Sequence, residues 1–192
     1  MASMYAVYHG PDGLRAIAER VHGTAVGLAT RLREAGVDVA EGPWFDTLRV
    51  TIPGGAADAV AAALSAGVNI WQADADTVLV SVDETTDPSE VAAVAGALGA
   101  SGDGAVVDEV DSTHAPRVSP DWPAALVRTS DYLTHPVFHS HRSETAMLRY
   151  LRRLSDRDFA LDRGMIPLGS CTMKLNATTE MVAITWPEFA GL

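Results

Sequence analysis

Apolar residues in the first hundred positions follow helical spacing in some stretches and alternate in others. Within residues 11–36 they recur every three or four positions, which predicts one amphipathic helix with Pro11 in its first turn. The run TLRVTI at residues 47–52 alternates and is rich in β-branched residues, so it predicts a strand. By the same reasoning we expect strands at 37–39, 68–72 and 77–82, and helices at 56–66 and 88–98. This order predicts an α/β fold, a two-layer sandwich with a largely antiparallel sheet.

The pattern changes after residue 100. Residues 101–130 are rich in Gly, Ser, Asp and Pro, which is typical of a linker, so we expect a small α/β domain over residues 1–100. Residues 131–192 are expected to be mainly helical. In that segment Ser143 can cap a helix that ends near residue 158, and a loop follows at residues 159–176. A last helix is expected at residues 177–185, with Pro187 as its stop.

The helix after Ser143 has an apolar stripe and a basic side. The basic side is formed by Arg149, Arg152, Arg153 and Arg157, with Asp156 available to pair. A solvated face is the simpler interpretation, and contact with a partner or a phosphate is the alternative.

Charge and cysteine content narrow the function classes. The formal net charge is −11, which argues against a nucleic-acid binder because such proteins need a dense basic face. Cys171 is the one cysteine, so an internal disulfide framework is excluded and a reducing, cytoplasmic location is expected. No run of 18 apolar residues occurs, so we expect no membrane span, and the N-terminus does not resemble a signal peptide.

Two clusters have weak metal-binding patterns. His135, His139 and His141 form H-x3-H-x-H, but Pro136 disfavours the helical geometry that zinc ligands would need. Capping, stacking or hydrogen bonding is the simpler role, and no metal site is expected. The acidic run at residues 83–87 lacks the spacing of a calcium loop, so we interpret it as a solvated turn.

The run GSCTMKLN at residues 169–176 concentrates hydrogen-bond donors: hydroxyls, one ammonium and one amide. Loops of this kind suit carboxylates and phosphates, although Ser and Thr also cap turns locally, and both interpretations remain open. Cys171 is more simply a buried thiol than a nucleophile, because no neighbouring base is present. No glycine-rich nucleotide-binding motif occurs.

Several of these segments together resemble one family. MIPLGSCTMKLN at residues 165–176, TWPEFA at 185–190 and HPVF at 135–138 closely resemble the P-protein family of the glycine cleavage system, the glycine dehydrogenases (decarboxylating). The run from Met4 to His22 is similar as well, so the resemblance covers essentially the whole chain. It implies the small domain of a fold-type-I pyridoxal-phosphate enzyme, followed by a linker and the opening segment of a second, homologous half.

The resemblance also implies chemistry. The family decarboxylates glycine with pyridoxal 5′-phosphate and passes the aminomethyl group to the lipoyl group of H-protein, with a homodimer as the expected assembly. Candidate residues lining the cofactor or substrate are Ser170, Cys171, Thr172, Lys174, Asn176 and His135. Lys174 is the only lysine, and it does not match the family's Schiff-base position, which lies farther along. We therefore assign no catalytic residue and expect the isolated chain to be inactive. The alternatives are a non-catalytic structural or interaction fragment and a His-rich metal-binding protein.

Overall fold

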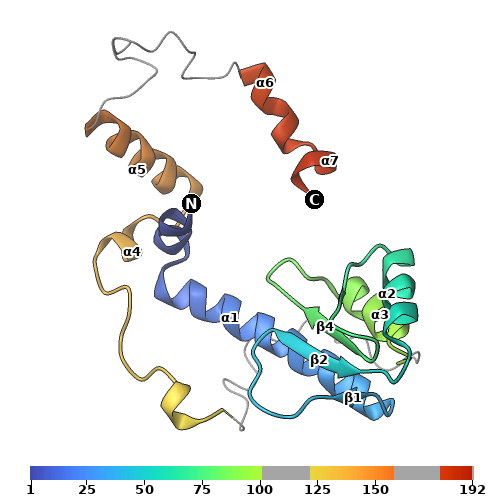
Figure 1. Cartoon of the computed structure of the whole chain (residues 1–192). Coiled ribbons are helices and arrows are strands. Elements are labelled where there is room, and N and C mark those ends of the chain that lie inside the picture. The colour runs from blue at the N-terminus through green and yellow to red at the C-terminus, as the bar shows by residue number, and fades with distance from the viewer. Residues whose placement is uncertain (101–121, 158–177, 192) are drawn as a thin grey trace, which may run out of the picture. The chain divides into compact units, whose positions relative to one another are not determined.

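The computed structural model describes residues 1–100, 122–157 and 178–191 (Figure 1). The chain divides into two compact units, Met1–Phe138 and His139–Leu192, which are considered separately below. Most of the expected linker and the GSCTMKLN loop lie outside the described residues. Residues 122–138, which comprise the end of the expected linker and the start of the segment after it, belong to the first unit.

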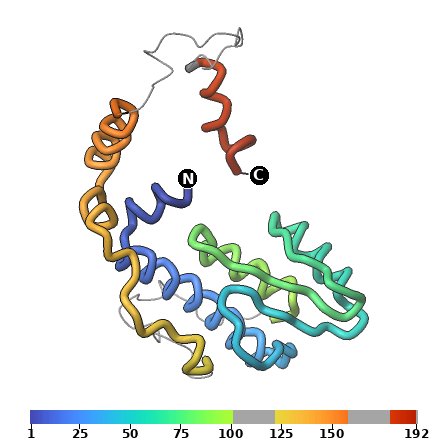
Figure 2. The backbone as a smooth tube through the Cα atoms, turned by 60° about the vertical axis from the view of Figure 1, so that its left-hand side comes forward, coloured from blue at the N-terminus to red at the C-terminus, as the bar shows by residue number. Residues whose placement is uncertain are grey.

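The longest element is α1 (Ala2–Glu34), which consists of two helices joined at a kink. Gly10 forms the kink with φ 63° and ψ −177°, a conformation that is essentially restricted to glycine. Pro11 follows directly and begins the second helix, as the sequence predicts. The helical turns before Gly10 were not predicted, and Figure 2 shows them turned away from the rest of α1.

Four antiparallel strands form one sheet in the order β1-β2-β4-β3. The strands are β1 (Asp38–Val39), β2 (Thr47–Thr51), β3 (Trp71–Gln72) and β4 (Thr77–Ser81). The third strand is shorter than the predicted 68–72, because the Val68 N–H donates to the carbonyl of Ala63 at the end of the preceding helix. The antiparallel sheet that the sequence predicts is confirmed.

Two further helices, α2 (Ala56–Ser65) and α3 (Pro88–Ala97), contact each other and pack with α1 on one face of the sheet. The paired residues Leu48 and Val80 point into this layer, as do Val50 and Val78. Leu32 of α1 is completely buried against them. The two-layer α/β sandwich is therefore confirmed, and its core lies between the sheet and three helices.

The start of α3 shows how strongly local sequence determines an element. The Asp87 side chain accepts hydrogen bonds from the backbone N–H groups of Ser89 and Glu90, at 2.7 and 3.0 Å. The Glu90 carboxylate in turn accepts from the Asp87 N–H at 2.9 Å, which completes a capping box. The predicted cap at Asp87 and the predicted first turn at Pro88 are both confirmed.

Beyond the sandwich, the chain forms short helices before and after one longer helix in the sequence. A single 3-10 turn lies at Ala124–Leu126, within the range expected to be linker. The α-helices are α4 (Val137–Ser140), α5 (Glu144–Arg157), α6 (Thr178–Val182) and α7 (Pro187–Ala190), with a 3-10 turn at Ala183–Thr185 after α6. No helix within the described ranges combines the length and the apolar character needed to cross a membrane.

The ends of these helices test two predictions. The Ser143 hydroxyl accepts from the Ala146 N–H at 3.2 Å, so the predicted start of α5 is confirmed. The role predicted for Pro187 was incomplete. The extended conformation of Trp186, with ψ 137°, interrupts the helix, and Pro187 then begins α7 at a position where its missing N–H has no cost.

Candidate functional site

Five of the six candidate residues predicted from the sequence lie outside the described part of the chain. They are Ser170, Cys171, Thr172, Lys174 and Asn176. The sixth, His135, is exposed and lies directly before α4. Its Nδ1 accepts a hydrogen bond from the Val137 N–H at 3.2 Å, and its carbonyl accepts from Phe138 at 3.0 Å. The neutral ring therefore carries its hydrogen on Nε2, which leaves that nitrogen as a donor.

The neighbouring histidines have arginine partners. Arg142 lies 3.2 Å from Nδ1 of His139, and Arg153 lies 3.3 Å from Nε2 of His141. Because a guanidinium can only donate, both imidazole nitrogens act as acceptors. Within the described ranges, no group of three or more His, Cys, Asp or Glu side chains is placed to hold a metal ion.

The basic side of α5 shows one ion pair within the described ranges. Arg152 contacts Asp156 at 3.2 Å, and both side chains remain about half exposed or more. Arg149, Arg153 and Arg157 follow one another at intervals of four residues on the same helix face. Like charges at this interval destabilise a helix by about 0.2–0.5 kcal/mol per pair. This face is therefore electrostatically unfavourable for the isolated helix.

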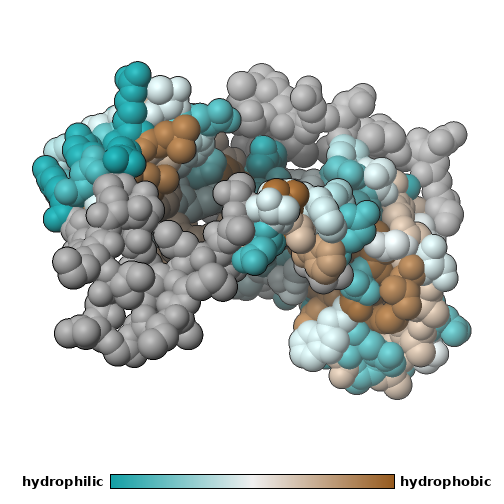
Figure 3. Space-filling model, turned by 90° about the horizontal axis from the view of Figure 1, so that it is seen from above, coloured by the Kyte–Doolittle hydropathy of each residue, from teal (hydrophilic) through white to brown (hydrophobic). Residues whose placement is uncertain are grey.

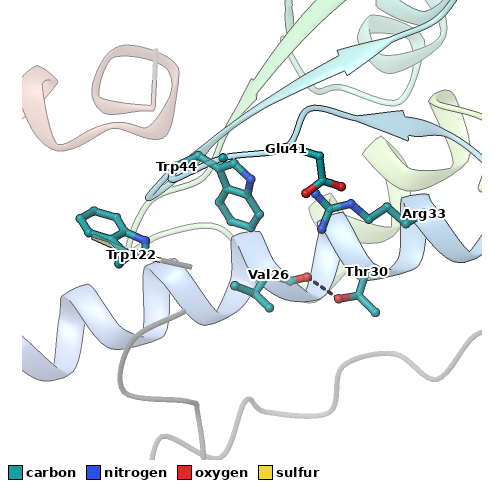
Figure 4. A pocket seen from close by; sticks show the side chains of 7 residues that line it. Val26, Thr30, Arg33, Glu41, Trp44 and Trp122 are labelled. Carbon is teal, nitrogen blue, oxygen red and sulfur yellow. Dashed lines mark hydrogen bonds between the residues drawn. The ribbon is translucent and has the colours of Figure 1, made fainter. Parts of the chain in front are cut away.

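A cavity of about 200 Å³ lies between α1 and the connection that joins β1 to β2 (Figure 4). Its lining includes two indole rings, Trp44 and Trp122, and two side chains of opposite charge, Arg33 and Glu41. Arg33 donates to the carbonyls of Val39 and Ala40 at 3.4 Å, which ties this end of α1 to the strand connection. The sequence did not predict this cavity, because Trp44 and Trp122 meet only through the tertiary fold.

His22 lies next to the same two tryptophans and is 7% exposed. Its Nδ1 lies 2.8 Å from the carbonyl oxygen of Phe45, so this nitrogen carries the hydrogen. Its ring is stacked on that of Phe45, with 5° between the planes. Among the described residues, the buried Nε2 has no hydrogen-bond partner. Burying such an acceptor costs about 1–3 kcal/mol, which the aromatic packing around the ring must offset.

The acidic run at residues 83–87 forms the solvated turn that the sequence predicts. One carboxylate oxygen of Asp83 accepts from the Thr85 hydroxyl at 2.7 Å and from the Thr85 and Thr86 N–H groups at 2.8 and 3.0 Å. These hydrogen bonds, that of the Thr85 hydroxyl first, hold the pKa of Asp83 below its ordinary value. This carboxylate oxygen therefore stabilises the turn itself.

The family assignment rests on the comparisons with known proteins. A family model described as the glycine cleavage system P-protein matches residues 1–98, which is half of the chain. The chain belongs to this family. A "Glycine dehydrogenase (decarboxylating)" of Stenotrophomonas maltophilia (strain R551-3) is 55% identical over 193 residues, covering 100% of this chain and 19% of the relative. Proteins of the same name from Jannaschia sp. (strain CCS1) and Xanthomonas axonopodis pv. citri (strain 306) are each 52% identical, with the same coverage.

The resemblance inferred from the sequence motifs is thus confirmed, and the chain spans about a fifth of the length of these P-protein relatives. The cofactor that the family implies is pyridoxal 5′-phosphate, and its attachment depends on a lysine. Pyridoxal 5′-phosphate is held covalently by a lysine amine, and the described residues include no lysine. The only lysine of the chain, Lys174, lies outside them. The described part of the chain therefore does not fit the covalent attachment of this cofactor.

Proposed function

We propose that this chain is one segment of a glycine dehydrogenase (decarboxylating). The observation that supports the proposal is similarity over the whole chain, at 52–56% identity, to relatives of that name. Identity at this level across both the folded sandwich and the later helices favours a shared activity of the complete proteins over a shared fold alone.

The proposed reaction of the complete protein releases CO₂ from glycine and passes the aminomethyl group to the lipoyl group of H-protein. Pyridoxal 5′-phosphate, when bound, supplies the electron sink for the loss of CO₂. The complete protein is proposed to be a cytoplasmic homodimer, and the single cysteine is consistent with a reducing compartment.

Within that protein, we propose that the GSCTMKLN loop lines the catalytic cleft. Ser170, Thr172 and Asn176 supply neutral hydrogen-bond donors, and Lys174 supplies a cation for the glycine carboxylate or the cofactor phosphate. Cys171 is the third residue of this loop. His135 lies outside this loop and is proposed to supply a further hydrogen-bond donor. The Val137 N–H donates to its Nδ1, so the Nε2–H of this exposed residue is available as a donor.

The isolated chain is proposed to be inactive, because the lysine that would hold the cofactor belongs to a part of the family that this chain does not match. Mixing the chain with pyridoxal 5′-phosphate should produce no stable absorption band that responds to glycine. A stable, glycine-responsive band would contradict this part of the proposal.

A chimera tests the main proposal. The matching segment of the Stenotrophomonas maltophilia relative is replaced by this chain, and CO₂ release from glycine is measured with lipoylated H-protein. We expect most of the activity to remain, whereas deletion of the segment abolishes it. A chimera that folds and binds cofactor but releases no CO₂ would show that this segment does not serve that reaction.

A further inference from the structure

Helix α5 presents a row of three exposed cations. Arg149, Arg153 and Arg157 lie at intervals of four residues, and we call them the arginine ridge. At a rise of 1.5 Å per residue the ridge is about 12 Å long. In Figure 3 hydrophilic residues dominate the left-hand part of the view, where α5 lies, beside a smaller hydrophobic area.

The central arginine is held in place by aromatic side chains. The rings of His141 and Tyr150 are stacked at 4.2 Å with 11° between their planes. The Arg153 guanidinium lies 5.4 Å from the centre of the Tyr150 ring, and its Nη2 lies 3.3 Å from the His141 imidazole. A guanidinium fixed in this way has already lost much of the rotamer freedom that binding would otherwise restrict.

Within the described residues, carboxylates do not neutralise the positive charge of the ridge. Asp156 contacts Arg152, which lies beside the ridge, and Arg149 and Arg157 have no carboxylate partner among the described residues. Residues 139–157 contain five arginines against two carboxylates, although the whole chain has a net charge of −11. The positive charge of this segment therefore contrasts with the chain that carries it.

The apolar residues of α5 lie on the other side of the helix from the ridge. Around the helix axis, Leu151 lies about 160° and Leu154 about 100° from Arg153, so the apolar side can pack while the ridge faces outward. A straight row of guanidinium groups on a convex helix matches carboxylates spread over a surface better than it encloses a small anion.

We propose that the arginine ridge is a docking surface for an acidic face of another protein. Arg149 and Arg157 supply charge at the two ends, and Arg153 presents a pre-oriented fork at the centre. Electrostatic complementarity of this kind accelerates encounter and fixes orientation. The proposal adds an interaction surface to the chain and does not depend on the roles assigned to the GSCTMKLN loop.

Fluorescence anisotropy of a labelled polyglutamate peptide tests the proposal with the 192-residue chain. The double variant R149Q/R157Q should weaken binding about tenfold at low salt, and added salt should weaken binding to the unmodified chain. The matched control R15Q/R49Q removes two exposed arginines of the first unit and should leave the affinity unchanged. Circular dichroism verifies that both variants keep their helix content.

Two further variants separate charge from orientation. R149K/R157K preserves the charge and should retain most of the binding, whereas Y150L preserves all cations and should weaken binding because Arg153 loses its aromatic support. Equal weakening by the control R15Q/R49Q would overturn the proposal. Tighter binding of inorganic tripolyphosphate than of the peptide, through the same arginines, would also overturn the proposal, because this result would identify a phosphate site.

Discussion

The hydroxyl of Tyr132 donates a 2.6 Å hydrogen bond to the carbonyl of Pro11, 121 residues earlier in the sequence. The contact joins the segment that follows the linker to the first turn after the kink in α1. Arg128 lies 5.6 Å from the centre of the Tyr132 ring and packs over it. The first unit therefore includes residues on both sides of the linker.

Removing this hydroxyl should loosen the contact. We expect Tyr132→Phe to lower the free energy of unfolding by about 0.5–1.5 kcal/mol, because a half-buried hydrogen bond is lost while the ring remains. Urea denaturation followed by tryptophan fluorescence measures the difference. Tyr8→Phe is the matched control and should be nearly neutral, since the structure describes a ring contact with His9 for Tyr8 and no hydroxyl partner. Equal effects of the two variants would show that the hydrogen bond of the Tyr132 hydroxyl does not stabilise the fold.

Gly10 and Gly96 should respond in opposite directions to the same substitution. Gly10→Ala should destabilise the chain by about 1–3 kcal/mol, because alanine is strained at φ 63° and the site is buried. Gly96→Ala should stabilise it by about 0.5–1 kcal/mol, because Gly96 lies inside α3 and an added methyl group meets no neighbour within 4 Å. The thermal midpoints of the two variants, measured beside the unmodified chain, provide the comparison. A neutral Gly10→Ala would show that the kink is not required.

These two glycines also show where sequence reasoning succeeds and where it stops. The interior of α3 is predicted because its cap and its apolar positions lie within a few residues of one another. The helix before Gly10 is missed because Ala2–His9 has no capping side chain and its packing depends on distant residues. Tyr5, for example, donates to Glu84 at 3.3 Å, a contact that no local pattern encodes.

The same limit applies to the candidate site. The GSCTMKLN loop is recognised because its residues are contiguous. Its resemblance to the family and its concentration of hydrogen-bond donors can therefore both be read directly from the sequence. The cavity beside Trp44 and Trp122 and the buried ring of His22 depend on residues that are far apart in the sequence. His22 lies next to Val21 on an otherwise apolar stripe, and only the stacked Phe45 explains how an imidazole is accommodated there.

Acid should weaken the cap of α3. The pKa of Asp87 lies below its ordinary value, chiefly because the Ser89 hydroxyl donates to it, and then because the Glu90 N–H does. A carboxyl with a lowered folded-state pKa stabilises the fold above its unfolded pKa of about 3.9, and this contribution is lost as the pH falls through the folded value. The thermal midpoint should therefore decline below about pH 4.

Asp87→Asn tests this explanation, since the amide keeps a cap acceptor but cannot titrate. The variant should show a shallower decline in thermal midpoint below about pH 4 than the unmodified chain. Asp83 also has a lowered pKa and remains in the variant, so part of the decline should persist. Identical acid profiles for the two proteins would show that Asp87 does not contribute.

The proposed role of Lys174 predicts a specific kinetic change in the chimera. Lys174→Ala removes the only lysine ammonium that this chain contributes, so the glycine KM should rise. A hydrogen bond between a carboxylate and an ammonium contributes about 1.5–3 kcal/mol when partly desolvated. Its loss corresponds to an increase in the glycine KM of about tenfold or more. Lys174→Arg keeps the charge and should recover part of the affinity, whereas Arg15→Ala, which removes a cation far away in the sequence, should leave KM unchanged. If KM and kcat both stay the same in Lys174→Ala, the ammonium contacts neither glycine nor the cofactor phosphate, and the loop's role must rest on its hydroxyl and amide groups.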